Sequence, residues 1–494
     1  MGVASRDPDL RGPGGASPGP RSVCRGGAGW GRGTGERTRR CVRGHVGWHP
    51  TRDPARRRPR HRGTRLPLPG GGGLGPEPGV RPLPGGGVTT TAVDWGLRTR
   101  PWELDPDARR ELHRALRFDY YKWDTFSAGG FTILPEYLVV PEELHHRVVA
   151  AVEGLSAGLS RFEARVRKEP EALVRLGIPK ALHPLIAAEP ERPHQCARYD
   201  LFPCDDGRLM VSEFNEDVPG GFNETEGLPV LLGDPGPGCR WEAGLRDHFV
   251  RAFADADAVA LLYATAFSED LQHMLILDAW LQAEGHPTVR GSPAHLTRRW
   301  FGGAAVLGTP VDAAFRFYPG EWMPRLPNFE TWRQLGPGLP MMNPLRHLVR
   351  QSKKMFALWW EDSAGDPDTR ALLEAHAPRT WPFDPARLDQ LRDEQPLWVL
   401  KRAFGRMGDA VVMGSLVPPK EWGEALRDAA GDPASWCVQS CFHVTPLDFQ
   451  AGTLFPTLGA FVVNGRFAGY YSRAAPRPFL THEALHVATV VQVS

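Results

Sequence analysis

Two short alternating segments, separated by a tight-turn sequence, constrain this chain more than any other feature. Residues 197–202 and 209–215 alternate as half-buried strands do, and Asp205-Asp206-Gly207 lies between them. Acidic residues followed by glycine favour a tight turn, because glycine adopts left-handed backbone at little cost. The sequence therefore predicts an antiparallel hairpin, and a hairpin determines which side chains share a face.

One face of this hairpin would gather charged and polar groups. Side chains two positions apart in a strand point the same way, so Arg198 lies with Asp200, and Glu213 lies with Asn215. Two carboxylates and an amide oxygen suit Mg2+, which typically takes one or two protein carboxylates plus substrate phosphates. A neighbouring Arg can bind phosphate or carboxylate through two hydrogen bonds. The alternative is a solvent-exposed face whose ion pairs contribute little.

A second candidate for phosphate binding follows a predicted strand at 397–401. This strand ends in Lys401, and the loop after it contains Gly405 and Gly408. Glycines let backbone N–H groups approach a phosphate closely, and a Lys can neutralise its charge. A Walker loop is excluded, because Gly-Lys-Ser/Thr is absent. The alternative is an ordinary turn before another strand, predicted at 410–413.

Two more segments place basic residues where they could meet a nucleotide. A helix predicted over 344–361 contains Lys353 and Lys354, and Arg473 follows a hairpin predicted over 458–471. Taken separately, a solvated helix face and a surface Arg are the alternatives. Phosphoryl transfer, however, requires cations, carboxylates and a glycine-rich loop together, and these segments supply all three.

The remainder of the chain from residue 93 onward alternates predicted helices with predicted strands. We expect helices at 141–169, 173–188, 241–253, 268–283 (capped by Ser268) and 418–429, a strand at 258–263, and paired strands at 304–307 and 313–317. Such alternation predicts an α/β or α+β architecture.

The first 90 residues differ in composition from the rest. They contain 17 Arg, no Lys, five acidic residues, 23 Gly and 13 Pro. So few apolar side chains cannot offset the entropy of ordering the chain, and we predict that residues 1–92 form a disordered extension to a catalytic region at 93–494. Nucleic-acid binding by the Arg residues is one interpretation. The absence of Lys instead favours a nucleotide-composition bias and no binding role.

Targeting and redox signals are sparse. No apolar core follows the basic N-terminal residues, and no apolar run of about 18 residues exists, so we predict neither a signal peptide nor a membrane span. The seven Cys include no CxxC pair. Scattered cysteines suit a reducing cytoplasm, which is the predicted location. Cys437 and Cys441 could approach a metal, but we interpret them as small buried residues.

Together the motifs resemble those of the glutathionylspermidine synthetase-like family, whose fold is a circularly permuted ATP-grasp. The matching residues are Arg198-x-Asp200, Glu213-x-Asn215-x-Asp217-x-Pro219, Glu226-Gly227, Asn343 to Lys354, Lys401 to Gly408, and Gly465-Arg466 to Arg473. The carboxylates precede the Lys and Gly-rich parts, which is the order of the permuted family. The resemblance implies an α+β fold with mixed and antiparallel sheets flanked by helices.

The resemblance also implies a reaction. It predicts an ATP-dependent ligase that joins a small peptide-like carboxylate to an amine through an acyl phosphate, with ATP and Mg2+ as cofactors. The implied roles are Mg2+ binding by Asp200, Glu213 and Asn215, ATP contacts by Lys354, Lys401, Gly405, Arg406, Gly408 and Gln439, and carboxylate binding with phosphoryl stabilisation by Arg198 and Arg473. The alternatives are a catalytically silent ATP-grasp scaffold and a nucleotide-binding protein. An N-terminal amidase, found in bifunctional members, is not expected here.

Overall fold

The computed structural model describes residues 93–127, 129–191, 194–405 and 411–493. All of them belong to the second of two units into which the chain divides, Gly86–Ser494. The predicted extension at 1–92 lies outside the described residues. Helices and mixed sheets together give the α+β class that the sequence predicts.

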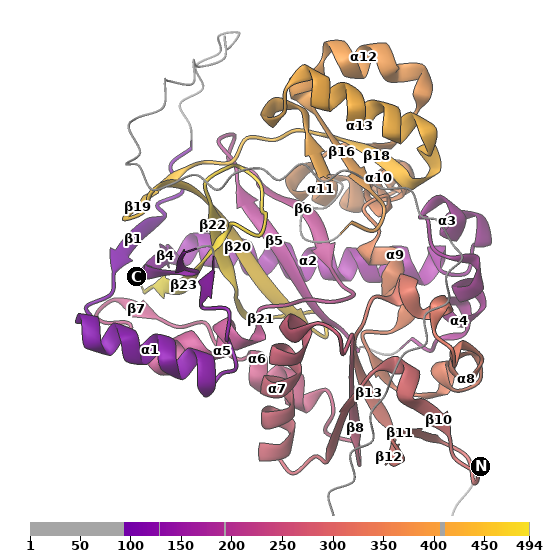
Figure 1. Ribbon diagram of the computed structural model, residues 1–494. Helices are drawn as coiled ribbons and strands as arrows, with labels where there is room; N and C mark the ends of the chain where they lie inside the picture. Colours follow the sequence, from indigo (N-terminus) through magenta and orange to yellow (C-terminus); the bar gives the residue numbers. More distant parts are fainter. Residues whose placement is uncertain (1–92, 128, 192–193, 406–410, 494) are drawn as a thin grey trace, which may run out of the picture. The chain divides into compact units, whose positions relative to one another are not determined.

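A ten-stranded sheet carries the hairpin predicted from sequence (Figure 1). The strands run in the order β1-β4-β23-β22-β20-β5-β6, with β19 and β21 added on β20 and β7 on β23. Their bounds are β1 Arg98–Pro101, β4 Ile133–Val140, β5 Cys196–Pro203, β6 Leu209–Asn215, β7 Cys239–Arg240, β19 Leu447–Phe449, β20 Gly452–Val463, β21 Arg466–Tyr470, β22 Ser472–Ala475 and β23 Leu485–Gln492. Because β4 pairs with β23 in parallel, early and late segments of the described chain lie side by side.

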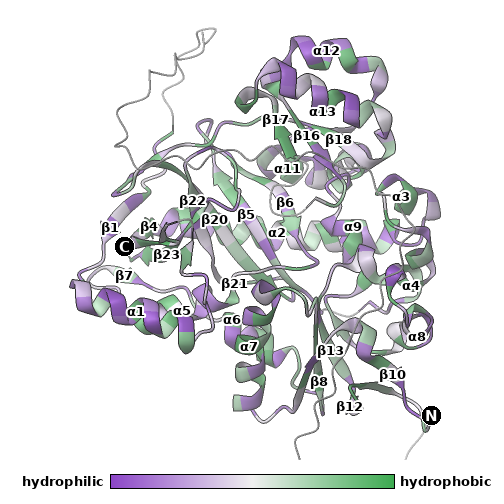
Figure 2. Cartoon of the chain, in the orientation of Figure 1, coloured by the Kyte–Doolittle hydropathy of each residue, from purple (hydrophilic) through white to green (hydrophobic). Residues whose placement is uncertain are grey.

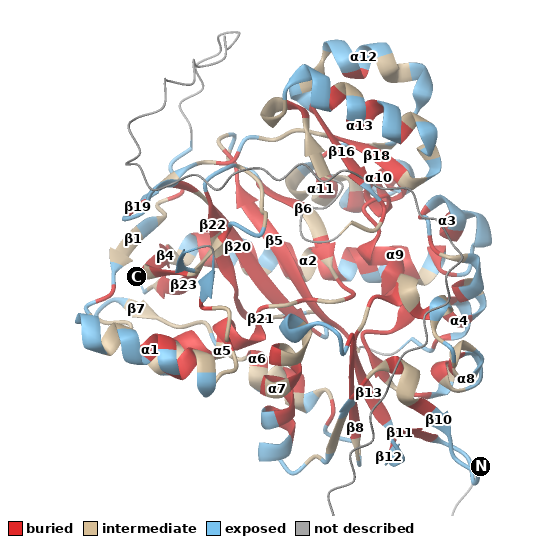
Figure 3. Cartoon of the chain, in the orientation of Figure 1, coloured by how far each residue is buried: buried red, intermediate tan, exposed pale blue. Residues whose placement is uncertain are grey.

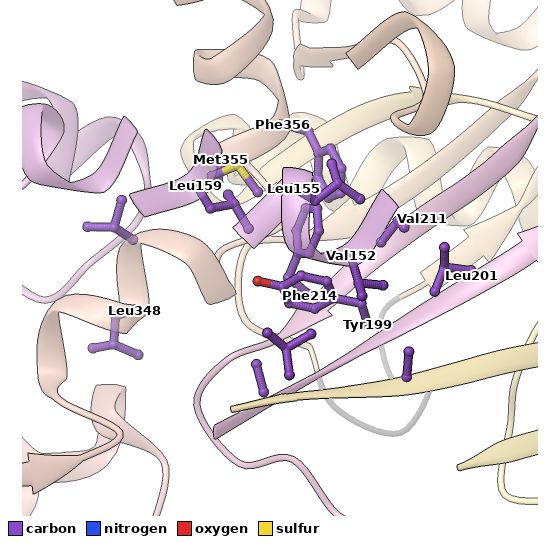
Figure 4. Packing of buried hydrophobic residues seen from close by; sticks show 14 of the residues in the cluster. Val152, Leu155, Leu159, Tyr199, Leu201, Val211, Phe214, Leu348, Met355 and Phe356 are labelled. Atoms are coloured by element: carbon purple, nitrogen blue, oxygen red, sulfur yellow. The ribbon is translucent and has the colours of Figure 1, made fainter. Parts of the chain in front are cut away.

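The long helix α2 (Glu142–Val166) packs on this sheet through a stripe at helical spacing. Val152, Leu155 and Leu159 are fully buried, and Figure 4 shows them with Tyr199 and Phe214 of the sheet. Burying side chains of this size stabilises the fold by about 1.5–3 kcal/mol each. Figure 3 shows that β5 and most of β20 are buried, so their polar side chains are held in a rigid setting.

A second sheet is parallel and has the order β14-β13-β8-β9. Its strands are β8 Val259–Tyr263, β9 Thr288–Gly291, β13 Ala313–Phe317 and β14 Met341–Met342. A separate three-stranded sheet contains β10 Leu296–Arg298, β11 Ala304–Val306 and β12 Thr309–Val311. The predicted pairing of 304–307 with 313–317 is therefore wrong. Residues 309–311 complete the hairpin, and the wholly buried β13 is a central parallel strand instead.

A smaller lobe contains Lys401. Its sheet has the order β15-β18-β16-β17, with β15 Thr380–Pro382, β16 Trp398–Arg402, β17 Val411–Met413 and β18 Trp436–Ser440. Helices α12 (Leu388–Asp393) and α13 (Pro419–Gly431) belong to this lobe, and Trp422 and Leu426 of α13 enter its apolar cluster. Figure 2 shows hydrophilic and hydrophobic residues on both helices, as expected for helices with one buried face.

The predicted helix at 344–361 is wrong as a single element. It consists of a 3-10 turn (Leu345–His347), α9 (Leu348–Gln351) and α10 (Met355–Asp362). The chain is extended at Ser352, whose hydroxyl donates to the Leu176 carbonyl oxygen at 2.7 Å. A side-chain bond to a distant backbone group thus replaces helix continuation.

Other helix predictions need smaller corrections. The segment predicted at 173–188 is divided at Gly177 (φ 76°) and Pro179 into α3, a 3-10 turn and α4, and the helix expected from 241 begins only after Gly244. Ser268 is the first residue of α7 and provides no side-chain cap. The remaining helices are α1 Pro106–Phe118, α3 Pro170–Arg175, α4 His183–Ala188, α5 Phe222–Leu232, α6 Leu245–Arg251, α7 Ser268–Ala283, α8 Phe329–Leu335 and α11 Pro367–His376.

None of the helices in the described ranges is long and apolar enough to span a bilayer.

Candidate active site

The β5–β6 hairpin is confirmed, and its polar face contains an irregularity. The register shifts between Tyr199 and Leu201, so that Asp200 lies opposite two residues, Ser212 and Glu213. Such a bulge bends a strand and redirects its side chains, and bulges are common next to active sites. The simple two-residue period of the sequence therefore does not describe this stretch fully.

Asp200 is the centre of a buried charge cluster. Arg198 donates from Nε and Nη2 to the two carboxylate oxygens at 2.9 and 3.0 Å, and Arg473 donates from Nη2 to Oδ2 at 2.8 Å. Asn215 adds a bond from Nδ2 to Oδ2 at 3.1 Å. Three residues from β5, β6 and β22 thus converge on one carboxylate that is 1% exposed.

A glycine makes room for this carboxylate. Gly459 of β20 pairs with Asp200, and a Cβ at Gly459 would lie 3.1 Å from Asp200 Oδ1 and 2.0 Å from the Tyr471 carbonyl oxygen. No side chain fits at the second distance. Because Gly459 has no side chain, the Asp200 carboxylate and the Tyr471 backbone can both pack closely against β20.

The arginines keep Asp200 ionised. Burial raises the pKa of a carboxyl group, but Arg198 and Arg473 outweigh that effect and hold the pKa of Asp200 below its ordinary value. In the same way, Asp200 offsets the burial of Arg198 and raises the guanidinium pKa. The two guanidinium groups and one carboxylate leave a net positive charge, which suits a phosphate or a substrate carboxylate.

Lysines surround the second carboxylate. Lys353 Nζ lies 3.0 Å from Glu213 Oε2 and donates to the Gly405 carbonyl oxygen at 2.8 Å. Lys401 Nζ donates to the carbonyl oxygen of Ser212, at the bulge, at 2.9 Å. The site therefore joins β6 of the large sheet to β16 of the smaller lobe and to Gly405.

At Lys401 and at Glu213, burial and the neighbouring charges act on the pKa in opposite directions. Burial lowers the pKa of Lys401 to about 8, although Glu213 opposes the shift. For Glu213, burial raises the pKa, but Lys353 and Lys401 outweigh it and the net pKa is lowered. Glu213 thus stays ionised, while Lys401 titrates close to physiological pH.

Sequence reasoning chose Lys354 and passed over its neighbour Lys353. The break at Ser352 directs Lys353 toward Glu213, whereas Lys354 Nζ bonds to the Ala434 carbonyl oxygen in the smaller lobe. Burial lowers the pKa of Lys354. The Lys-Lys pair was visible in the sequence, but its orientation depends on a helix break that the periodicity did not indicate.

The remaining predicted ATP contacts occupy less direct positions. Gln439 is buried on β18 and its Nε2 donates to Thr380 Oγ1 at 3.1 Å. Arg406 and Gly408 lie outside the described residues. Cys437 is buried on β18, and burial raises its thiol pKa to about 11, so it remains protonated. Cys441 follows the end of that strand.

The donor set at the hairpin fits Mg2+ in its chemistry. Asp200, Glu213 and Asn215 offer hard oxygen atoms, and both carboxylates are ionised. The Asp200 carboxylate bonds to Arg198, Arg473 and Asn215, and the Glu213 carboxylate pairs with Lys353. Among the residues described, no three His, Cys, Asp or Glu side chains are grouped to hold a metal alone. Phosphate oxygens of a nucleotide would have to supply further ligands.

The sequence model of the family described as "Glutathionylspermidine synthase preATP-grasp" matches residues 135–492. The chain belongs to this family. This match confirms the resemblance inferred from the motifs. Membership in this family indicates an ATP-grasp-type ligase. No curated protein matches the chain.

The fold is shared with a solved structure. A glutathione synthetase-like effector from Globodera pallida, in its apo form, matches with a TM-score of 0.53 and 13% identity, covering 79% of this chain and 98% of its own. A putative gamma-glutamylcysteine synthetase from Methylobacillus flagellatus matches with a TM-score of 0.39 and 13% identity, covering 66% and 85%. At 13% sequence identity, the match to the Globodera pallida structure demonstrates a shared fold only.

Proposed function

We propose that this protein is an ATP-dependent carboxylate–amine ligase that forms an amide bond through an acyl phosphate. The observation that carries the proposal is the convergence of four cations on two ionised carboxylates. Arg198, Arg473, Lys353 and Lys401 come from separate segments and meet at Asp200 and Glu213. Phosphoryl transfer relies mainly on such positioning and charge stabilisation.

The proposed roles follow the charges. Asp200, Glu213 and Asn215 would hold Mg2+, which supplies Lewis-acid neutralisation of phosphate charge when bound. Lys353, Lys354 and Lys401 would contact the ATP phosphates. Gly405 begins the segment that, with Arg406 and Gly408, would cover them, and Gln439 would contribute from β18.

Arg198 and Arg473 are proposed to bind the substrate carboxylate and stabilise the transferred phosphoryl group. A carboxylate oxygen attacks the γ-phosphorus, and the bond to ADP breaks. The amine nitrogen then attacks the acyl carbon, phosphate departs, and the nitrogen loses a proton. The guanidinium groups compensate the negative charge that gathers on the phosphoryl oxygens.

The segment order supports a circularly permuted ATP-grasp arrangement. Asp200 and Glu213, which we assign to the metal, precede Lys401 and Gly405, which we assign to the nucleotide. Ordinary ATP-grasp enzymes have these parts in the reverse order. We further propose a peptide-like carboxylate and an amine as substrates, and the cytoplasm as the location.

The test is a screen for release of ADP and phosphate from ATP and Mg2+, across a panel of peptide-like carboxylates and amines. Turnover is expected only when both an acid and an amine are present. Glu213→Ala and Lys401→Ala should abolish it while circular dichroism remains unchanged. A wild-type protein that binds no ATP at millimolar nucleotide would contradict the proposal. A protein that binds ATP but stays inert throughout the panel would favour a silent scaffold.

A further inference from the structure

One aromatic ring contacts both arginines of the candidate site. Tyr471 lies between β21 and β22, and its side chain is buried. The guanidinium carbon of Arg198 lies 5.0 Å from the ring centroid, and that of Arg473 lies 5.3 Å from it. Both distances fall within the range of a cation–π contact, which extends to about 6 Å.

The position of this ring is closely specified by two glycines. The Tyr471 backbone N–H donates to the Gly459 carbonyl oxygen at 2.6 Å. On the other side, Gly221 precedes α5 with φ 113°, and a Cβ there would lie 2.6 Å from the Tyr471 ring. Because neither glycine has a side chain, the Tyr471 backbone can approach the central strand β20, and the Tyr471 ring can approach the start of α5.

Charge balance gives the ring a physical role. Arg198 and Arg473 carry two positive charges, while Asp200, which bonds to both, carries one negative charge. The uncompensated repulsion would tend to drive the guanidinium groups apart. An aromatic face has negative electrostatic potential, so a ring touching both cations reduces that repulsion without adding an anion to the carboxylates Asp200 and Glu213 of the site.

The hydroxyl group is not the active part of this side chain. Burial, and then Glu224, raise the pKa of Tyr471 to about 12, so the phenol stays neutral at physiological pH. A neutral phenol adds no charge near the arginines. The ring itself, which phenylalanine shares, accounts for the two contacts.

We propose that Tyr471 is a positioning residue for phosphoryl transfer, because its ring holds the guanidinium groups of Arg198 and Arg473 at the spacing that the reaction requires. This inference rests on the proposed ligase function. It extends that function by adding a residue that touches neither nucleotide nor substrate and acts only through the two arginines.

The first test compares Tyr471→Leu with Tyr471→Phe, using the ADP-release assay. In Tyr471→Leu, kcat should fall by about 10- to 100-fold, while KM for ATP stays within about twofold. The Phe variant should restore kcat to within about twofold of wild type. A purely structural role would not separate kcat from KM in this way.

A matched control is available in the adjacent residue. Tyr470 is also buried, but its ring packs against His145 and Phe467. Tyr470→Leu should therefore lower thermal stability at least as much as Tyr471→Leu without the same loss of kcat. Equal kcat in the Leu and Phe variants of Tyr471 would overturn the proposal. An equal loss of kcat in Tyr470→Leu and Tyr471→Leu would also overturn it.

Gly221→Ala gives an independent test in which residue 471 remains a tyrosine. Its added Cβ must displace the ring, so kcat should fall as it does in Tyr471→Leu. Wild-type kcat in a folded Gly221→Ala protein would contradict the inference.

A structural readout separates this inference from the proposed function. In a crystal structure of Tyr471→Phe, Arg198 and Arg473 should both keep their contacts with Asp200. In a crystal structure of Tyr471→Leu, at least one of these contacts should be lost. If the wild type binds no ATP, the ligase proposal fails while this result still decides whether the ring positions the arginines. Unchanged arginines in the Leu variant would refute the positioning role.

Discussion

At the scale of single residues, charge compensation determines how the candidate site behaves. Asp200 accepts from two arginines and an asparagine while almost wholly buried, so its charge is balanced only by those partners. Removing one partner of a buried ion pair leaves an uncompensated charge, which costs far more than loss of a surface pair.

Replacement of Asp200 by Asn should therefore affect both activity and stability. We expect ADP release to fall by at least about 100-fold and the free energy of unfolding in urea to fall by about 3–5 kcal/mol. Asp206→Asn is the matched control on the same hairpin, because Asp206 pairs with Arg208 at the surface. Its expected effect is below about 1 kcal/mol. Equal stability of the two variants would contradict the buried pairing.

Because we assign Lys401 to the nucleotide, we predict that nucleotide binding depends on pH. Its pKa of about 8 in the folded chain means that its positive charge is lost above that pH. Isothermal titration should therefore show ATP affinity falling as pH rises beyond about 8, with the midpoint moved upward because phosphate favours the protonated amine. Lys401→Arg should remove this dependence, since Arg remains charged. An unchanged pH profile in the Arg variant would assign the titration to another group.

The same lowered pKa has a consequence for stability. The unfolded chain binds a proton at Lys401 up to about pH 10.5, whereas the folded chain releases it near pH 8. Between these values the unfolded state binds more protons, so the Lys401 contribution to stability rises with pH. Wild type should therefore gain stability relative to Lys401→Met between pH 8 and 10, as measured by urea unfolding.

At the scale of elements, local interruptions matter more than regular segments. The bulge opposite Asp200, the extended Ser352 and the side-chain-free Gly459 each depart from an ideal strand or helix. Each departure places a side chain of the candidate site: the first Glu213, the second Lys353, and the third Asp200. Regular elements supply the rigid frame in which these departures are held.

Gly459→Ala should disrupt the centre of the large sheet. Its Cβ would lie 2.0 Å from the Tyr471 carbonyl oxygen, so β20 and the backbone between β21 and β22 must separate. We expect a loss of about 1–3 kcal/mol or more in thermal or urea unfolding, together with loss of ADP release. Gly431→Ala is the control, because its Cβ would meet open space. A Gly459→Ala protein as stable as Gly431→Ala would be incompatible with this packing.

At the scale of the whole molecule, the site depends on long-range contacts within residues 93–493. Asp200 and Arg473 are 273 positions apart, and Ser212 and Lys401 are 189 apart. All the residues that we assign to the candidate site lie between Arg198 and Arg473 in the sequence. Function should therefore reside in the region that the family match covers, 135–492, and its immediate flanks.

A chain starting at residue 93 is expected to retain ATP binding and ADP release within about twofold of the full-length rates. Binding of single-stranded RNA, measured against salt concentration for both chains, tests the remaining role of the Arg-rich segment. Any RNA binding through these Arg residues should depend steeply on salt concentration, because it rests on phosphate contacts. Such binding should disappear on truncation, because the shorter chain lacks these residues. Loss of ADP release in the shorter chain would show that residues 1–92 contribute to the enzyme.

Local signals in the sequence were sufficient for two of the hairpins. Asp205-Asp206-Gly207 marked the turn between β5 and β6, and Asn464 and Gly465, both at positive φ, formed the turn predicted between β20 and β21. A turn depends on a few neighbouring backbone angles, so its residues carry the information themselves. The order of short motifs was likewise enough to indicate the family.

Tertiary structure alone decided which groups meet. Periodicity predicted one helix across Ser352, yet a bond to Leu176 breaks it and directs Lys353 to Glu213. It also did not indicate that Tyr471 would contact two arginines, one of them on β5. These outcomes depend on partners over a hundred positions away, and packing selects such partners only when the whole chain is folded. The sequence by itself determined the hairpins β5–β6 and β20–β21, the family and the inventory of charged groups, and the fold determined how those charged groups pair.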